Sequence, residues 1–268
     1  MTMTFSLHEN FELNGVDYYN NEAASASSDR HQSFTDEIRL FTEKLQIRKF
    51  KNDIKRPRLM EVLEKSSAQF GATLITGRAG TGKTALAAQF ARKYKRVAWL
   101  SIDSADSDWK IFSAYLSACL AGNCKDRKIK KSHSRNSMPS ESEVSSRIET
   151  LMAQFGSKTK SNPGLIVLDD AHYIFDSPWF SAFFNSLLYS LPPETHLLVL
   201  SRGAPSLPLW RLRSKQVLGV VDEKLLGFDI DETRKLFRKF GCSPELASQA
   251  HSKSFGRISH LKSLAESL

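Results

Sequence analysis

The chain has 268 residues, 41% of them hydrophobic, and its 38 Lys and Arg residues outnumber 29 Asp and Glu residues to give a formal net charge of +9. This length can bury one large core, or a core with a small appendage. No apolar run is long enough to cross a bilayer, the N-terminus lacks a signal-peptide pattern, and the three cysteines lack metal-ligand spacing. These features argue against a membrane-spanning or disulfide-rich secreted protein, and we expect a cytoplasmic one.

The charge is divided unevenly along the chain. Residues 1–37 contain seven acidic residues against Arg30 alone, a net charge of −6, so the remainder carries +15. Residues 1–35 are polar and lack apolar periodicity, which predicts a disordered acidic tail. The basic remainder suits either a polyanion such as nucleic acid or a solvated surface. Its most basic run, residues 125–135, has no aromatic residues for base stacking, and we expect a flexible loop there.

Two short helices and a strand are expected next. Apolar positions at helical spacing predict a helix over 36–45, and Pro57 near the first turn favours another over 56–63. Residues 72–76 are apolar and predict the first core strand.

A glycine-rich loop follows this strand and leads into helix-forming sequence. Its residues, in order, are Gly77, Arg78, Ala79, Gly80, Thr81, Gly82, Lys83 and Thr84. The pattern G-x-x-x-x-G-K-T between a strand and a helix indicates a cradle for nucleotide phosphates, in which backbone N–H groups and the helix N-terminus face the anion. Lys83 would reach the β- and γ-phosphates, and the Thr84 hydroxyl would ligate Mg²⁺. The motif predicts an ATP- or GTP-binding protein.

Further alternation of strands and helices follows. Residues 96–102 predict the second strand, 108–121 a helix, and 140–156 another helix that opens with a capping box. The apolar run 164–168 predicts a strand buried on both faces and ends in two carboxylates. Ligands bind at the carboxyl ends of strands in α/β sheets, so Asp169 is the candidate Mg²⁺ partner and Asp170 the residue that orients or deprotonates the attacking water.

The next apolar strand, residues 196–200, ends in Ser201 and Arg202. A cation at this end of a strand can contact the γ-phosphate and stabilise transition-state charge, or be an ordinary surface arginine. A strand predicted at 217–221 precedes three short helices, near 229–241, 243–255 and 258–264. We interpret these helices as a lid over the nucleotide, in preference to a helix-turn-helix.

Together these elements predict an α/β fold: a doubly wound, mostly parallel P-loop NTPase core over 36–225 and a small α-helical lid over 226–268. Several short sequence segments resemble those of a known family. They are Arg56-Pro57-Arg58-Leu59, residues 97–103, residues 167–172, Leu191-Pro192-Pro193, residues 200–202, residues 208–213 and residues 226–228. With them the chain resembles the STAND class of signal-transduction ATPases, specifically the nucleotide-binding module of large LuxR-type, maltose-activator-like transcription regulators.

The resemblance implies a switch. In that family an ADP-bound closed form is inactive, ATP with an inducer opens the module for self-association, and slow hydrolysis resets it. Carried over by position, Lys83, Thr84, Asp169 and Arg202 hold phosphate and metal, and Arg58 borders the base. The family commonly has Gly-x-Pro at its adenine contact, whereas this chain has Gly256-Arg257-Ile258, where Ile258 supplies apolar packing.

Three functions follow in order of preference. The first is an ATP-binding regulatory switch that acts through a protein partner or self-association. The second is a nucleic-acid-stimulated AAA+-type ATPase, which the +15 remainder could serve. A small-molecule kinase comes last, because no second substrate motif lies beside Asp170.

Overall fold

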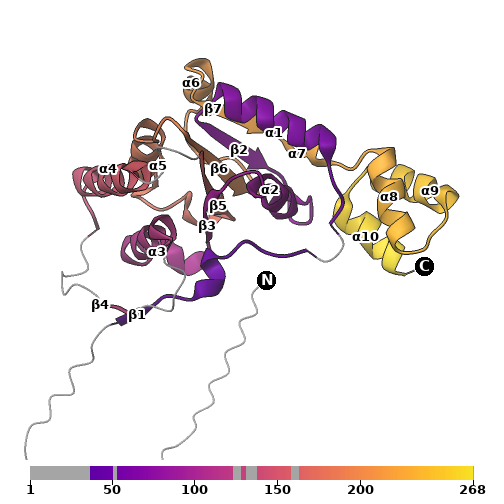
Figure 1. The fold of residues 1–268 in the computed structure, drawn as a ribbon, viewed down its shortest axis with the longest axis horizontal. Coiled ribbons are helices and arrows are strands. Elements are labelled where there is room, and N and C mark those ends of the chain that lie inside the picture. The colour runs from indigo at the N-terminus through magenta and orange to yellow at the C-terminus, as the bar shows by residue number, and fades with distance from the viewer. Residues whose placement is uncertain (1–36, 51–52, 123–127, 131–137, 158–162, 268) are drawn as a thin grey trace, which may run out of the picture. The chain divides into compact units, whose positions relative to one another are not determined.

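A five-stranded parallel sheet lies at the centre of the computed structural model, which describes residues 37–50, 53–122, 128–130, 138–157 and 163–267 (Figure 1). Its strands, in spatial order, are β3 (Arg96–Ser101), β5 (Gly164–Asp169), β6 (Thr195–Ser201), β2 (Ala72–Thr76) and β7 (Leu218–Val221). The predicted α/β fold is confirmed. The expected disordered tail, residues 1–35, lies outside the described residues.

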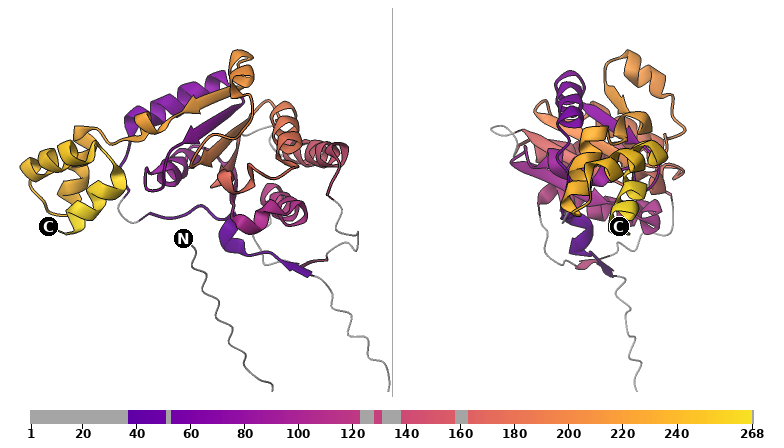
Figure 2. Two further views of the ribbon diagram at one scale, coloured as in Figure 1. Left: turned by 180° about the vertical axis from the view of Figure 1, so that it is seen from behind. Right: turned by 90° about the vertical axis from the view of Figure 1, so that its right-hand side faces the viewer.

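The burial and composition of two inner strands, β5 and β6, are typical of a parallel sheet. Every residue of β5 and β6 is buried, and each strand contains an uninterrupted apolar run, 165–168 in β5 and 197–200 in β6. A strand covered on both faces cannot alternate apolar with polar residues, so continuous apolar runs are typical of parallel sheets flanked by helices. Figure 2 shows helices on both faces of this sheet.

The covering helices form two apolar layers. On one face α1 (Pro57–Gln69) and α2 (Lys83–Ala91) pack against the sheet, and Leu59, Phe90 and Trp99 belong to the same buried cluster. On the other face lie α3 (Trp109–Ala121), α4 (Glu141–Ser157) and α5 (Phe180–Tyr189), where Phe112 and Phe183 pack edge to face. The short helix α6 (Leu209–Ser214) precedes β7.

Strand β6 lies between β2 and β5 and pairs with both. Thr76 at the end of β2 is in register with Ser201, and Leu168 in β5 with Val199. The carboxyl ends of the three strands therefore meet at one edge of the sheet. This topology brings together three segments that are far apart in sequence.

The C-terminal helices have their own small core. After α7 (Glu223–Leu226) come α8 (Ile230–Lys239), α9 (Pro244–Ser254) and α10 (Ile258–Glu266), close to the three expected helices. Phe228, Phe237 and Leu261 form the centre of a buried cluster that also includes Ile54. Helix α8 begins with a reciprocal capping box between Asp229 and Glu232.

The helix expected over 36–45 is wrong in its first half. Residues Glu37–Arg39 form the strand β1, which pairs antiparallel with β4 (Lys128–Lys130), and only Thr42–Leu45 form a 3₁₀ helix, η1. Strand β4 lies inside the run expected as a flexible loop. A partner strand about 90 residues away in the chain overrides the local helical spacing. No helix among the described residues is both long and apolar enough to cross a membrane.

Candidate functional site

The glycine-rich loop leaves β2 at the sheet edge where the three strands end. The N–H of Gly77 donates to the carbonyl oxygen of Ser201 at 3.1 Å, which ties the loop to β6. Gly80 and Gly82 have φ values of +79° and +83°, in the left-handed region that favours glycine. A Cβ at Gly82 would lie only 2.7 Å from Cδ1 of Ile258, so a side chain at this position would displace the Ile258 side chain of α10.

Lys83 is the first residue of α2 and lies almost fully buried beneath the loop. Its Nζ donates to the carbonyl oxygens of Gly77 and Arg78. Burial lowers the pKa of this ammonium, and the negative charges of Asp170 and Asp169 oppose the shift. The charge therefore sits inside the loop, close to both predicted carboxylates.

Thr84 and Asp169 meet across the gap between the loop and β5. The Thr84 hydroxyl donates to Oδ1 of Asp169 at 3.1 Å, and Asp169 is 1% exposed. Burial, and then the charge of Asp170, raises the pKa of Asp169 to about 6, while the Thr84 hydrogen bond acts against them. Oδ2 of Asp169 is buried and has no hydrogen-bond partner among the described residues.

This pair fits a magnesium site shared with a nucleotide. A hydroxyl and a carboxylate are oxygen ligands of the kind that Mg²⁺ prefers, and the unpartnered Oδ2 leaves a lone pair free for a ligand. The described part of the chain contains no cluster of three or more His, Cys, Asp or Glu side chains suited to a metal. Mg²⁺ held by Thr84 and Asp169 would thus complete its shell with phosphate oxygens and water, as it usually does.

Asp170 and Arg202 lie at the same sheet edge. Asp170 directly follows β5, has φ +57°, and precedes the short 3₁₀ helix η3 (Ala171–Ile174). A non-glycine residue in this region is uncommon and often marks a functional turn. Arg202 follows β6 and is exposed, and its positive charge acts on Lys83. The structure thus brings Lys83, Thr84 and Asp169 close to both residues.

A cavity of about 520 Å³ lies beside the loop, between the core and the C-terminal helices. It is lined by Phe50, Asp53, Ile54, Arg56, Gly80, Gly82, Ala85, Gln89, Phe228, Leu236, Ile258, Ser259, Lys262 and Glu266. Ile258, predicted as an apolar nucleotide contact, is among them. The volume is within the range typical of ligand pockets.

Arg56 lines this cavity, whereas Arg58, the residue predicted to border the base, does not. Arg56 is 3% exposed and donates to the carbonyl oxygens of Leu226 and Gly227 and to Glu232, while its Nη1 has no partner among the described residues. Arg58 is partly exposed and donates to the carbonyl oxygens of Leu225 and Gly227. Both arginines belong to the segment Arg56-Pro57-Arg58, and nothing in the local sequence indicates which of them lines the cavity.

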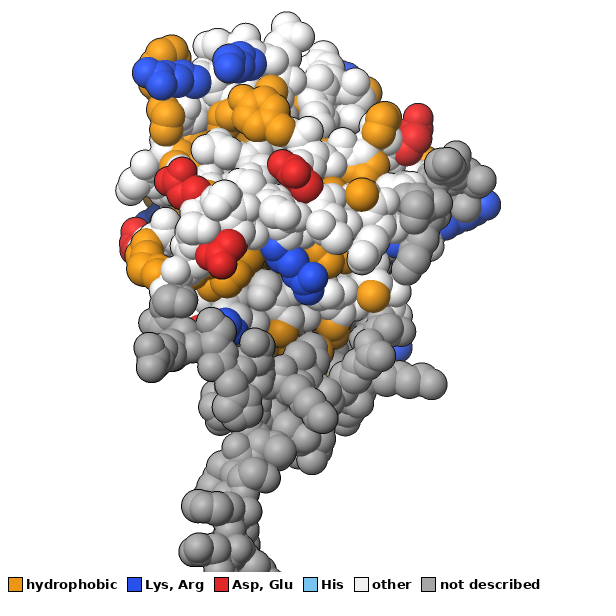
Figure 3. Space-filling view, turned by 90° about the vertical axis from the view of Figure 1, so that its left-hand side faces the viewer, with side chains coloured by type: hydrophobic (Ala, Val, Ile, Leu, Met, Phe, Trp, Pro, Cys, Tyr) orange, Lys and Arg blue, Asp and Glu red, His pale blue; other side chains and the backbone are white. Residues whose placement is uncertain are grey.

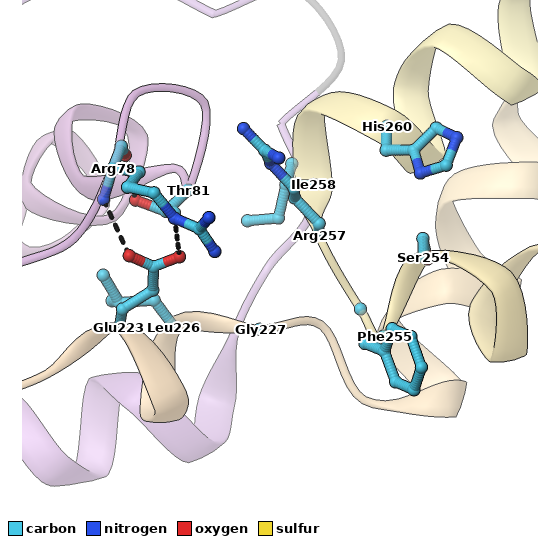
Figure 4. A pocket seen from close by; sticks show the side chains of 11 residues that line it. Arg78, Thr81, Glu223, Leu226, Gly227, Ser254, Phe255, Arg257, Ile258 and His260 are labelled. Carbon is cyan, nitrogen blue, oxygen red and sulfur yellow. Dashed lines mark hydrogen bonds and ion pairs between the residues drawn. The ribbon is translucent and has the colours of Figure 1, made fainter.

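A second cavity, of about 300 Å³, lies at the loop beside α7 and the α9–α10 turn (Figure 4). Its lining includes Arg78, Thr81, Glu223, Arg257 and Ile258. The carboxylate of Glu223 accepts from the backbone N–H of Arg78 at 2.9 Å and from its Nε at 2.8 Å. The loop is therefore attached directly to the segment that leads into α8. Of the remaining predicted loop residues, Ala79 lies between Arg78 and Gly80 and is exposed.

Comparisons with known proteins agree with this geometry. A family profile described as an AAA ATPase domain matches residues 55–200. The chain is 30% identical over 190 residues to the HTH-type transcriptional regulator MalT of Vibrio parahaemolyticus, and 29% identical over 195 residues to MalT of Vibrio cholerae. Each match covers 70% of this chain and 20% of the relative, so the chain spans about a fifth of the length of these relatives.

A solved structure gives the same fold. A STAND protein with a tetratricopeptide repeat sensor from Pyrococcus horikoshii superposes with a TM-score of 0.54 at 18% identity, covering 82% of this chain and 30% of that one. With the sequence matches, it confirms the resemblance that the motifs carried.

Proposed function

The chain belongs to the AAA ATPase domain family, and from that premise we propose that it is an ATP-binding regulatory switch that slowly hydrolyses ATP to ADP and phosphate. The contact between Thr84 and Asp169 carries the proposal, because it joins the phosphate loop to the acidic strand end in one buried site. The relatives are named as a transcriptional regulator and a signal-transduction ATPase, which supports a role in transcription regulation or signalling.

Each side chain at the sheet edge has a defined task in this proposal. Lys83 binds the β- and γ-phosphates, and Thr84 and Asp169 hold Mg²⁺, which would neutralise phosphate charge. Asp170 orients the attacking water and accepts its proton. Arg202 faces the developing charge on the γ-phosphate. Backbone N–H groups of residues 77–84 surround the phosphates.

The contacts between the loop and the C-terminal helices support the switch. The N–H of Ser259 in α10 donates to the carbonyl oxygen of Gly80 at 3.1 Å, and Arg56 bonds the segment that leads into α8. A nucleotide in the 520 Å³ cavity would touch both sides at once. We therefore propose that residues 226–268 act as a lid over a core formed by 36–225, and that the terminal phosphate changes the lid's position.

The proposed partner is a protein or a second copy of the chain, reached through the nucleotide-binding module in the cytoplasm. A ligand can shift a two-state element only by its different affinity for the two states. ATP and ADP differ in the γ-phosphate, which lies nearest Asp170 and Arg202 in this proposal. Self-association is accordingly expected to differ between the ADP and ATP states.

The test is the nucleotide content and affinity of the purified chain. Denatured protein should release adenine nucleotide, and titration should show Mg²⁺-dependent binding of ATP and ADP. Lys83→Ala removes the buried ammonium and should abolish both. If the wild-type chain neither carries nor binds an adenine nucleotide, the proposed function is wrong.

One observation favours the alternative of a nucleic-acid-stimulated ATPase. On α6 the Trp210 side chain is 65% exposed, the Arg211 guanidinium lies over its ring at 5.2 Å, and Arg213 and Lys215 are exposed nearby. Figure 3 shows basic side chains beside hydrophobic ones at the top of this face, where α6 lies. Exposed aromatics with cations suit single-stranded nucleic acid. ATP turnover that rises on adding DNA, with salt-sensitive binding, would favour this alternative.

A further inference from the structure

Glu223 on α7 binds the phosphate loop at two points. Its Oε2 accepts from the backbone N–H of Arg78 at 2.9 Å, and its Oε1 accepts from the Nε of the same residue at 2.8 Å (Figure 4). The bond to the N–H, and then the bond to the side chain, lowers the pKa of Glu223, so the carboxylate is ionised at pH 7. Two bonds to one partner fix its orientation as well as its distance. The second residue of the loop is therefore held by its main chain and its side chain together.

The sheet topology places Glu223 beside the start of the loop. Strand β7 pairs with β2 in parallel, and Val221 is in register with Ile75. The chain leaves these neighbouring strands at the same edge of the sheet, once into α7 and once into the loop. A Cβ at Gly77 would lie 3.4 Å from Cβ of Glu223, so the two segments pack in van der Waals contact.

Helix α7 packs with the core and not with the C-terminal helices. Leu226 on α7 is buried in the same cluster as Ile75 of β2. Phe228, only two residues further on, is buried with Leu261 of α10 in the other cluster. The contact between Glu223 and the loop therefore lies within the core, on the near side of the connection to α8.

The loop has a second attachment of a different kind. The N–H of Ser259 in α10 donates to the carbonyl oxygen of Gly80 at 3.1 Å. In the proposed switch the C-terminal helices move, and this contact would move with them. The contact between Glu223 and Arg78 would remain, because α7 and the loop leave neighbouring strands of one sheet.

We propose that Glu223 is a positioning residue, which keeps the phosphate loop in its binding conformation while the C-terminal helices change position; this inference rests on the proposed nucleotide binding. A loop that spends only part of its time in that conformation binds phosphate more weakly by the same fraction. The loop surrounds phosphates that ATP and ADP share, so Glu223 sets the affinity for both nucleotides equally. Among the described residues the hydrogen bonds of its carboxylate go to Arg78, and none reaches Asp170 or Arg202. The bond-breaking step accordingly does not need it.

Three variants separate the two bonds. Glu223→Ala removes both, Glu223→Gln retains an oxygen that accepts from the N–H of residue 78, and Arg78→Ala removes the side-chain bond alone. ATPγS and ADP affinities are measured by titration calorimetry, and hydrolysis by single-turnover assays with saturating ATP. Asp222→Asn is the matched control, because it removes the adjacent negative charge and keeps an oxygen for the N–H of Leu225.

We expect Glu223→Ala to bind ATPγS and ADP about tenfold more weakly, by the same factor, and to hydrolyse saturating ATP within about threefold of the wild-type rate. Glu223→Gln and Arg78→Ala should each lose less affinity than Glu223→Ala. Both residues belong to one contact, so the double variant Glu223→Ala with Arg78→Ala should bind no more weakly than Glu223→Ala alone. Asp222→Asn should match the wild type.

Several results would overturn the inference: wild-type affinity in Glu223→Ala, a loss confined to ATPγS, a large fall in the saturated hydrolysis rate, or additive losses in the double variant. Thermal unfolding checks that each variant is folded, and Glu223→Gln keeps the test decisive if Glu223→Ala is not. If the wild type binds neither nucleotide, the proposed function is wrong and the role of Glu223 is wrong with it. If the wild type binds both and Glu223→Ala binds them equally tightly, only the inference is wrong.

Discussion

Arg56 and Glu232 form a buried ion pair across 176 residues of sequence, with Nη2 of the arginine 3.3 Å from Oε2 of the glutamate and both side chains 3% exposed. Glu232→Ala would leave the buried guanidinium without its ion-pair partner and would also remove half of the α8 capping box. We expect the free energy of unfolding to fall by about 3–5 kcal/mol in urea titrations.

An exposed ion pair on α1 provides the matched control for the buried pair. Lys65 and Glu61 form an ion pair on α1 in which both side chains are largely in solvent. Lys65→Ala should therefore change the unfolding free energy by less than about 1 kcal/mol. A similarly small effect of Glu232→Ala would show that the buried pair contributes little to stability.

Gly82 is predicted to be intolerant of a side chain for two separate reasons. Gly82→Ala places alanine at φ +83°, which costs roughly 1–2 kcal/mol, and its Cβ would press on Ile258. We expect ATP affinity to drop more than tenfold in titration calorimetry, because the strained loop and the displaced Ile258 side chain both line the cavity proposed for the nucleotide. Gly122→Ala has a similar φ of +72° but nothing within 4 Å, so it reports backbone strain alone. Equal losses of stability in the two variants would argue against the close contact with α10.

Asp170→Asn tests the proposed proton acceptor without disturbing the turn. Asparagine adopts the left-handed conformation readily, so the backbone at φ +57° should be kept. We expect ATP hydrolysis to slow about 100-fold in single-turnover assays while ADP affinity stays within a few-fold of wild type. An Asn variant that hydrolyses ATP at the wild-type rate would remove Asp170 from the catalytic role.

His196 is predicted to make stability fall in mild acid. Burial lowers its pKa to about 4, while a hydrogen bond with the Phe70 carbonyl oxygen acts in the opposite direction. In the unfolded chain its pKa is about 6.5, so protonation favours unfolding. The neutral form's contribution is complete above about pH 6.5 and is lost as the pH falls toward 4, by up to about 3 kcal/mol.

Urea unfolding at a series of pH values between 7.5 and 4 measures this loss. His196→Leu cannot titrate, so its stability should depend less on pH across that window than that of the wild type. Identical pH slopes in the two proteins would show that His196 does not carry the effect. The comparison cancels contributions from the carboxylates, which are the same in both chains.

The glycine-rich loop and the two aspartates after β5 could be predicted from the sequence, because each lies in one continuous segment next to an apolar strand. The cradle comes from the continuous segment 77–84 between an apolar strand and a helix, and Asp169 directly ends another apolar strand. Parallel pairing then brings the carboxyl ends of these strands to one edge of the sheet, independently of the length and conformation of the connecting loops. The Thr84 contact with Asp169 follows from that topology.

The residues that sequence reasoning missed act through partners far along the chain. Arg56 is recognisable only once Glu232 lies beside it. The strand β1 forms because it pairs with β4, about 90 residues further along the chain. The local spacing of residues 36–45 contains no sign of that pairing and favoured a helix.

The position of β6 between β2 and β5 sets the distance between two parts of the candidate site. Two interstrand steps, each about 4.8 Å, separate the end of β2 from the end of β5 by roughly 10 Å, and the Thr84 hydrogen bond to Asp169 spans this gap from α2. Neither step involves the C-terminal helices. In the proposed switch, movement of those helices would admit, retain or release the nucleotide, while the strand order would keep Lys83 and Asp169 at the same edge of the sheet.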